Sequence, residues 1–325
     1  MNISLVFYRE CARCREAGLK VYLVQRCNLL RKVLEDLTDS VVLKLALSRT
    51  NFRYVVERCP NAAQMYKWYY ISNSFSRRDR LLSMINHYWF VDKHFKPYFM
   101  ISIMEGEILL WEEVKDTNRY SISLAYDMHC SEGDLSLIYK LNGELLYTLA
   151  FAFIPGRIVS MSAAQVLFIS RIQGGCNYDL IRSSIKAFDG IRPAVMLLAV
   201  ARAIAAALGI TSIAGVRTKH QIAFACRICT FQEEVFNYDQ FWTEIGGQRP
   251  NNGQVFSVPI TPCHIPLSDR KREHRPRKMH YYQFESNLIR ETQDTFKHLC
   301  LKARNRAEQE SRVISMLEEN SPDEW

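Results

Sequence analysis

The segment Ala194–Val216, AVMLLAVARAIAAALGITSIAGV, decides the fold because nearly every residue in it is apolar and Arg202 is its only charge. About 20 apolar residues can cross a bilayer as a helix, so a membrane span is one interpretation. Pro193 suits a first helical turn and Gly209 suits a helix C-cap, which favours a buried helix followed by a short β-branched strand. That helix would be roughly 24 Å long, shorter than the apolar layer of a bilayer.

Arg202 separates the two interpretations further. A cation at the centre of a bilayer costs about 2.5 to 3.5 kcal/mol on insertion scales. In a protein core it requires a carboxylate or carbonyl partner, because an unpaired buried charge is costly. The sequence therefore predicts a buried helix and strand in which Arg202 is paired.

Composition bounds the class of protein. The 325 residues are 48% hydrophobic, enough for one large domain or two, and the net charge of +8 favours an anionic partner. Peripheral contact with the inner membrane is one such partnership, without a transmembrane segment, and nucleic acid is a less favoured one. The N-terminal residues lack the pattern of a secretory signal, and ten scattered cysteines fit reduced thiols, so we expect a cytoplasmic protein, with signal-less export left open.

The pattern along the chain predicts three regions. Residues 1–100 show apolar positions at helical spacing, residues 101–265 contain period-two strands and helices, and residues 266–325 form a basic linker and a C-terminal helix from Tyr282 to Leu317. The aromatic and cationic residues between positions 65 and 95 indicate a helix with its aromatics inward, or a surface that stacks bases. The run RKREHRPRK at 270–278 is a solvated linker or an anion-binding patch.

The best local signal is Asn142-Gly143 between two apolar runs, because this dipeptide favours the type I′ turn of a β-hairpin. A further strand at 165–170 precedes Gln173-Gly174-Gly175, and two helices then separate it from the strand that ends at Val216. These elements predict an α+β fold: a helical N-terminal region followed by a mixed, mostly antiparallel sheet with packed helices.

Several blocks of the sequence resemble the bacterial VirK/YbjX family. They are the hairpin followed by Arg171-Ile172-Gln173-Gly174, then Gly190-Ile191-Arg192-Pro193, and then Tyr238-Asp239-Gln240-Phe241-Trp242 with Gly246-Gly247. The resemblance implies a virulence-associated protein of Gram-negative bacteria that supports envelope integrity and resistance to cationic antimicrobial peptides. It implies no established biochemical activity, and it is looser around His220 and at Cys226-Arg227-Ile228-Cys229.

The arrangement of hairpin, strand, glycines and helix is also similar to the Gcn5-related N-acetyltransferase (GNAT) fold, in which a helix N-terminus binds the pyrophosphate of coenzyme A. This similarity implies an acyltransferase that uses coenzyme A or another acyl thioester. The residues that would bind the cofactor are Gln173, Gly174, Gly175 and Arg192. The extra helix after Gly175 leaves open which of these residues form the cradle.

Acyl transfer to an amine requires a base for the amine proton and an acid for the leaving thiolate. Position along the chain suggests His220 as the base and Tyr238 as the acid. The alternative interpretations, which a packed core favours, are a hydrogen-bonded core histidine and a buried aromatic residue. No metal is expected, since the pairs Cys11/Cys14 and Cys226/Cys229 lie too far apart for a compact zinc site. The alternative function is a non-catalytic basic factor that binds an anionic partner.

Overall fold

The computed structural model describes residues 19–48, 51–127, 131–225, 236–250, 253–262 and 275–303. The chain divides into two compact units, Met1–Arg49 and Thr50–Trp325. The described part of the first unit is a long helix, α2 (Leu19–Leu47), in agreement with the helical spacing of its apolar residues. The predicted boundaries near residues 100 and 265 both fall inside the second unit.

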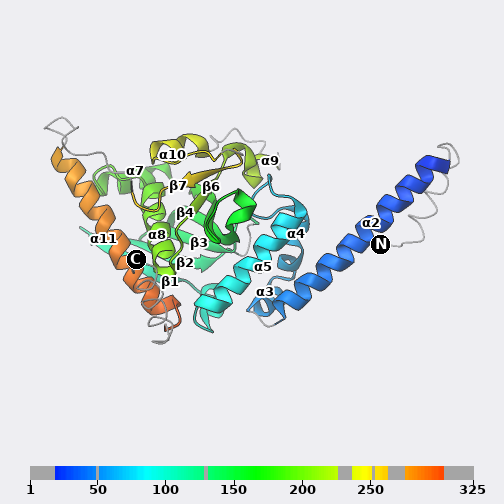
Figure 1. Ribbon diagram of the computed structural model, residues 1–325. Helices are drawn as coiled ribbons and strands as arrows, with labels where there is room; N and C mark the ends of the chain where they lie inside the picture. Colours follow the sequence, from blue (N-terminus) through cyan, green and yellow to red (C-terminus); the bar gives the residue numbers. More distant parts are fainter. Residues whose placement is uncertain are drawn as a thin grey trace, which may run out of the picture. The chain divides into compact units, whose positions relative to one another are not determined.

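A seven-stranded sheet forms the centre of the second unit (Figure 1). Its strands lie in sequence order, and all neighbours are antiparallel except β5 and β6, which are parallel. The strands are β1 (Ile108–Lys115), β2 (Asn118–Tyr126), β3 (Leu135–Leu141), β4 (Glu144–Pro155), β5 (Gln165–Gly174), β6 (Ile213–Val216) and β7 (Val255–Val258). The predicted α+β class with a mostly antiparallel sheet is confirmed.

The turn between β3 and β4 is the predicted Asn-Gly hairpin. Asn142 and Gly143 have φ angles of 51° and 86°, the two left-handed positions that a type I′ turn requires. The Asn142 side chain also accepts a hydrogen bond of 2.8 Å from the backbone N–H of Arg119, which ties the turn to β2. In β3, the alternate residues Leu135, Leu137, Tyr139 and Leu141 are all buried, as the period-two pattern predicts.

Two helices connect the parallel strands β5 and β6. They are α7 (Tyr178–Ala187) and α8 (Pro193–Leu208), which begins at the predicted proline and ends at Gly209 in the left-handed conformation. Helix α8 packs against β3, β4 and β5, and nearly all of its residues are buried. Among the described helices, none combines the length and the apolar character needed to span a bilayer. The prediction of a buried helix and strand is confirmed.

Arg202, inside α8, has the partners that the sequence analysis requires. Its guanidinium contacts the Glu285 carboxylate at 3.1 Å and donates to the Pro259 carbonyl at 3.0 Å, and both charged side chains are at least 95% buried. Glu285 lies on α11 (Arg275–Cys300), which packs along α8 and β1. Helix α11 begins at Arg275, seven residues before the predicted start at Tyr282. Some of its side chains are buried, so it is not a purely external element. Residues after 303 lie outside the described ranges.

In the second unit, the α-helices before the sheet are short except for α5 (Arg77–His94); the others are α3 (Phe52–Arg58), α4 (Met65–Trp68) and α6 (Phe99–Glu105). Helix α5 lies along the part of β4 that extends past β3. There Asn86 donates to the Phe153 carbonyl at 2.9 Å, and the Phe153 N–H donates to Nδ1 of His87 at 3.2 Å. These side chains complete the hydrogen bonds that a strand would otherwise supply.

The aromatic residues around α4 and α5 divide between core and surface. Tyr66, Tyr70, Phe75 and Tyr88 are buried, which fits the interpretation of inward-packed aromatics. Trp68, Tyr69 and Trp89 are exposed instead. The sequence pattern therefore contains both core positions and exposed surface aromatics.

Candidate functional site

The six predicted site residues gather at the carboxyl ends of β5 and β6. Gln173 and Gly174 end β5, and Gly175 follows; Arg192 is the N-cap of α8; His220 ends the short 3₁₀ helix η3 (Thr218–His220) after β6. Tyr238 begins α10 (Tyr238–Glu244), which packs on β6 and β7. The carboxyl ends of parallel strands are where ligands bind in α/β sheets. The fold thus brings the predicted residues to one end of the sheet.

The two glycines allow the end of β5 to approach β4 closely. A Cβ at Gly174 would lie 2.8 Å from the Tyr147 ring, and one at Gly175 would lie 2.8 Å from the Leu145 carbonyl oxygen. The N–H of Gly175 donates to the Leu146 carbonyl at 2.8 Å. The Gly175 amide is therefore used by the protein itself, whereas the Gln173 side chain is exposed.

Arg192 lies at the start of α8, where no side chain caps the first helical turn. Its guanidinium forms a 2.8 Å ion pair with Glu244 of α10 and lies 5.8 Å from the Phe241 ring centre. The Arg192 and Glu244 side chains are 51% and 38% exposed. Hydrogen bonds from Arg192 and from Gln240 lower the pKa of Glu244. The accessible guanidinium of Arg192 at the positive end of the α8 dipole is suited to an anion. The backbone contributes less, because Pro193 has no N–H and the Val195 N–H donates to the Arg192 carbonyl at 2.9 Å.

His220 is held in one tautomer. Its Nδ1 lies 2.9 Å from the Gln254 carbonyl oxygen, and because a carbonyl only accepts, Nδ1 carries the proton and Nε2 is an acceptor. Burial lowers the pKa of His220, although the hydrogen bond to Gln254 acts in the opposite direction. The imidazole is consequently neutral at pH 7 and has the protonation state that a general base needs.

Tyr238 has a different environment. Its buried hydroxyl accepts a hydrogen bond from the Ile172 N–H and donates one to the Ile172 carbonyl, each at 3.1 Å. These groups lie on β5 beyond Ile169, the last residue that pairs with β6. Burial raises the pKa of Tyr238. The phenol therefore bonds to the edge of β5 at a position that β6 does not reach. To act as the predicted catalytic acid, the Tyr238 hydroxyl would have to break its hydrogen bonds with Ile172.

Other residues of the family-like blocks hold α10 in place. Trp242 packs on Gly215, where a Cβ would lie 2.3 Å from the indole ring, and its Nε1 donates to the Val216 carbonyl at 2.7 Å. Asp239 forms a 2.8 Å ion pair with Arg217, just after β6. The Tyr-Asp-x-Phe-Trp block is thus the segment that fixes α10 to the sheet.

Sequence reasoning missed a polar cluster around Arg171 on β5. Arg171 forms ion pairs with Asp127 and, at 3.4 Å, with Glu132, which also accepts from the Gln221 side chain. The three charged side chains are at most 14% exposed. The sequence did contain one signal, because a cation within an apolar strand needs partners. The spacing of residues did not show that these partners, Asp127 and Glu132, lie some forty residues earlier in a loop.

A second buried cluster surrounds Asp134, which directly precedes β3. Its carboxylate accepts hydrogen bonds from Tyr70, from Tyr88 at 2.9 Å and from Tyr126 at 3.4 Å. Nε2 of the fully buried His87 lies 4.0 Å from the same carboxylate and has no hydrogen-bond partner. Burial lowers the pKa of His87, with a smaller opposing effect from Asp134. This cluster joins α5 to the β2–β3 connection.

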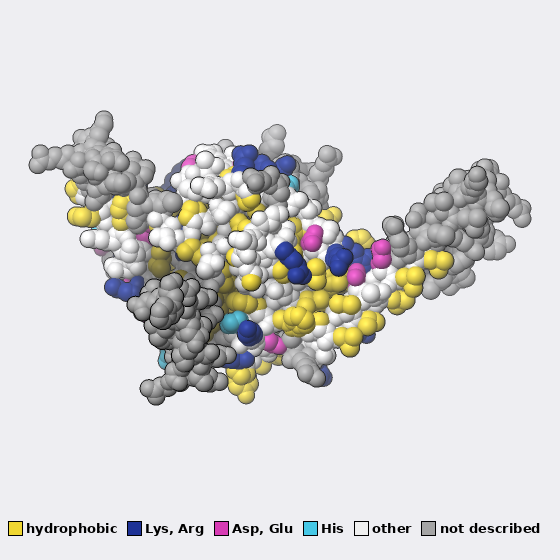
Figure 2. All heavy atoms as spheres, in the orientation of Figure 1, with side chains coloured by type: hydrophobic (Ala, Val, Ile, Leu, Met, Phe, Trp, Pro, Cys, Tyr) yellow, Lys and Arg dark blue, Asp and Glu magenta, His cyan; other side chains and the backbone are white. Residues whose placement is uncertain are grey.

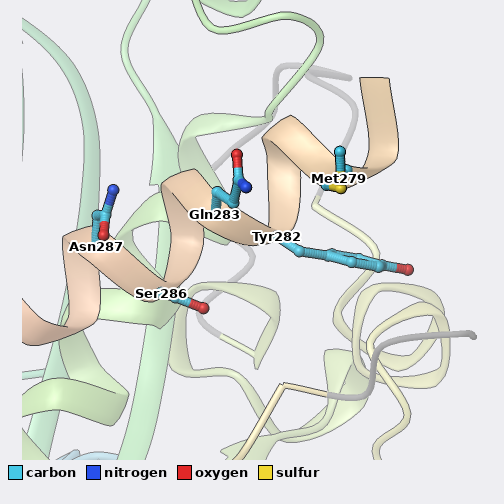
Figure 3. A pocket seen from close by; sticks show the side chains of 5 residues that line it. All are labelled: Met279, Tyr282, Gln283, Ser286 and Asn287. Atoms are coloured by element: carbon cyan, nitrogen blue, oxygen red, sulfur yellow. The ribbon is translucent and has the colours of Figure 1, made fainter. Parts of the chain in front are cut away.

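Two pockets lie along α11, away from the predicted site residues. One has a volume of about 460 Å³ and is lined by Met279, Tyr282, Gln283, Ser286 and Asn287, which all project from this helix (Figure 3). Another, of about 490 Å³, lies between α11 and the edge strand β1 and includes Trp111 and Phe284. None of the six predicted site residues lines either pocket.

The structure describes only part of the predicted cysteine pairs and basic run. Cys11, Cys14, Cys226 and Cys229 lie outside the described residues, as do positions 270–274 of the basic run. Arg277, from the same run, donates to the Asp189 carbonyl at 2.9 Å. No group of His, Cys, Asp or Glu residues within the described ranges has the arrangement of a metal site.

Comparison with known proteins identifies the family. No match was found among curated proteins or among solved structures. A family model described as "Protein of unknown function (DUF535)" matches residues 22–294, which is most of the chain. DUF535 is the designation of the VirK/YbjX family, so the match agrees with the resemblance of the sequence blocks. The chain belongs to the DUF535 family.

Proposed function

We propose that this protein transfers an acyl group from coenzyme A, or from another acyl thioester, at the carboxyl ends of β5 and β6. The observation that carries the proposal is the parallel pair β5–β6 with the uncapped N-terminus of α8 and the accessible Arg192 at the same end. Helix N-termini bind pyrophosphate through backbone amides, and arginine binds it through paired hydrogen bonds. The resemblance to the GNAT arrangement supports the same assignment.

In this proposal Arg192, at the positive end of the α8 dipole, binds the pyrophosphate. Nε2 of His220 accepts the proton of the attacking amine as the new C–N bond forms and the thioester C–S bond breaks. The departing thiolate takes a proton from Tyr238 if its hydroxyl leaves Ile172, and otherwise from water. The acceptor is a component of the bacterial envelope or its precursor, since the VirK/YbjX resemblance implies a role in envelope integrity and peptide resistance.

A non-catalytic alternative has its own support. The Tyr238 hydroxyl and the Gly175 amide are both engaged by backbone groups, so two predicted site residues already have structural partners. With a net charge of +8, the protein would then act by binding an anionic partner, such as a lipid surface at the inner membrane. The two functions differ in the ligand that stabilises the folded protein.

Thermal unfolding with added ligand distinguishes them. A ligand bound only to the native state, at about 100 times its Kd, should raise the Tm by roughly 5 °C. We expect coenzyme A or an acyl derivative to give this rise. Arg192→Ala should reduce the rise by about half or more, whereas Arg182→Ala should leave it unchanged, because Arg182 is an exposed, ion-paired arginine on α7.

No rise with coenzyme A, with acyl derivatives or with an acyl carrier protein would contradict the proposal. So would an undiminished rise in Arg192→Ala. Stabilisation by anionic lipid vesicles alone, falling steeply with salt, would support the alternative instead.

A further inference from the structure

The pocket between α11 and β1 lies apart from the proposed acyl-transfer site. In the sheet, β1 is four strand spacings, about 19 Å, from β5. The volume of the pocket, about 490 Å³, is in the range of small-molecule sites. One wall consists of residues that recur three or four positions apart on one face of α11: His280, Phe284, Asn287 and Glu291. The opposite wall comes from β1 and consists of Trp111, Glu112 and Glu113.

The most buried part of the pocket lining is apolar. Trp111 and Leu288 are 6% and 2% exposed, and the Trp111 and Phe284 rings meet edge to face with their centres 6.1 Å apart. The apolar surface continues along α11, where Met279 and Tyr282 line the adjoining pocket and Figure 2 shows hydrophobic side chains over the start of the helix. Such a lining favours an apolar ligand body, and aromatic rings also attract cations.

The Trp111 indole supplies a hydrogen-bond donor to this pocket. Within the described residues its Nε1–H has no hydrogen-bond partner, and Nε1 is not one of the fully enclosed polar atoms. Because Trp111 is almost completely buried and lines the pocket, its accessible N–H faces the pocket. The indole of Trp242, by contrast, donates to the Val216 carbonyl. An indole N–H can only donate, so a ligand would need an acceptor oxygen at Trp111.

The charged residues that β1 contributes to the pocket are acidic. Glu112 forms a 2.6 Å ion pair with Arg119, and the Glu113 carboxylate lies 3.5 Å from the Lys115 ammonium. Neither cation lines the pocket. These two carboxylates are therefore balanced by partners on its outside.

Glu291 leaves the pocket with an uncompensated negative charge. Its carboxylate has no ion-pair or hydrogen-bond partner in the part of the chain that the structure describes. His280, the remaining ionisable group of the lining, lies 3.0 Å from the Asp189 carboxylate outside the pocket. No lysine or arginine is present among the described lining residues. A cationic ligand would complement this charge.

From the aromatic lining, the free indole donor and the uncompensated carboxylate, we infer that this pocket binds a small organic amine with an aromatic body and a carbonyl oxygen. The ammonium contacts Glu291, the ring packs against Trp111 and Phe284, and the carbonyl oxygen accepts the Trp111 N–H. The pocket excludes coenzyme A, because its phosphates would meet the carboxylates. The inference is independent of acyl transfer.

The probe 4-(aminomethyl)benzamide has all three features: an ammonium group at pH 7, an aromatic ring and an amide carbonyl. Titration of the full chain should shift the indole resonance of Trp111 in proton–nitrogen correlation spectra and give a Kd. Trp111→Phe identifies this resonance by its loss. No shift of the Trp111 resonance at millimolar probe would overturn the inference.

Two variants of α11 test the contact with the ammonium. Glu291→Gln should weaken binding of the probe about two- to five-fold, as expected for an exposed ion pair. Asp294→Asn is the matched control, because Asp294 is an exposed carboxylate of the same helix outside the pocket, and it should bind the probe as the wild type does. A Glu291→Gln variant that binds as tightly as the wild type would overturn the assignment to a cation.

Two analogues of the probe separate its groups. 4-Methylbenzamide, which lacks the ammonium, should bind more weakly than the probe, and Glu291→Gln should not change its affinity. Benzylamine, which lacks the carbonyl, should also bind more weakly, because it leaves the Trp111 N–H without an acceptor. Affinity for either analogue equal to that for the probe would overturn the corresponding contact.

Discussion

Two arginines of α8 form ion pairs in opposite environments. Arg202 pairs with Glu285 in the core, where the side chains are 3% and 5% exposed, and Arg192 pairs with Glu244 at the surface, where they are 51% and 38% exposed. The same interaction therefore serves two purposes in one helix. The buried pair joins α8 to α11, whereas the exposed pair contributes little to stability, so our proposal assigns Arg192 to an anionic ligand.

The largest effect should come from breaking the buried pair. Arg202→Met leaves Glu285 as an unpaired buried charge and should lower the free energy of unfolding by about 3 to 5 kcal/mol, whereas Arg192→Met should cost less than about 1 kcal/mol. Urea unfolding at 25 °C measures both. The double variant Arg202→Met, Glu285→Leu should recover most of the loss, because apolar side chains can replace a buried ion pair. Equal losses in the two single variants would remove the distinction between core and surface pairs.

Protonation of His87, a buried side chain whose Nε2 has no hydrogen-bond partner, should have a smaller effect on the free energy of unfolding. Its pKa in the folded state lies below the ordinary 6.5, chiefly because of burial, so the unfolded state binds more protons below that pH. The free energy of unfolding should therefore be fully retained above pH 6.5. It should fall as the pH decreases from 6.5 to the folded-state pKa, by up to about 1.4 kcal/mol per pH unit.

Denaturant unfolding between pH 7.5 and about pH 5 measures this dependence. His87→Gln should be less stable at pH 7 but show a flatter profile, since Gln does not titrate. His220→Gln is the control, because the pKa of His220 is also lowered but this residue is only partly buried. A His87→Gln profile as steep as that of the wild type would assign the acid sensitivity to other groups.

Local signals in the sequence were sufficient for the fold. Pro193, Gly209 and the Asn142-Gly143 turn act through backbone geometry that any fold must obey, so the central helix and the hairpin were predictable. Because Arg202 is buried, it required a partner, but no local signal identified Glu285. This residue lies 83 residues later, in the C-terminal helix that was predicted to begin at Tyr282. Long-range pairing of this kind depends on packing that spacing does not encode.

The end of the sheet at which the candidate residues lie was predictable, but their contacts were not. Strand and helix order place Gln173, Arg192 and His220 after the carboxyl ends of β5 and β6, because the carboxyl ends of parallel strands meet at one edge of a sheet. The partners of Tyr238 were not predictable, since its hydroxyl bonds to the backbone of a strand sixty-six residues earlier. The cluster around Arg171 was missed for the same reason.

The smallest but most direct test compares coenzyme A binding by the wild type with binding by two variants of the exposed pair. In isothermal titration calorimetry, Glu244→Gln should bind roughly two- to five-fold more tightly, because it removes the carboxylate that competes for Arg192. Arg192→Ala should bind about ten-fold or more weakly, since a charge-assisted hydrogen bond is lost. Equal affinity in all three proteins, or no detectable binding in any of them, would contradict the claim that the start of α8 is a binding site for an acyl thioester.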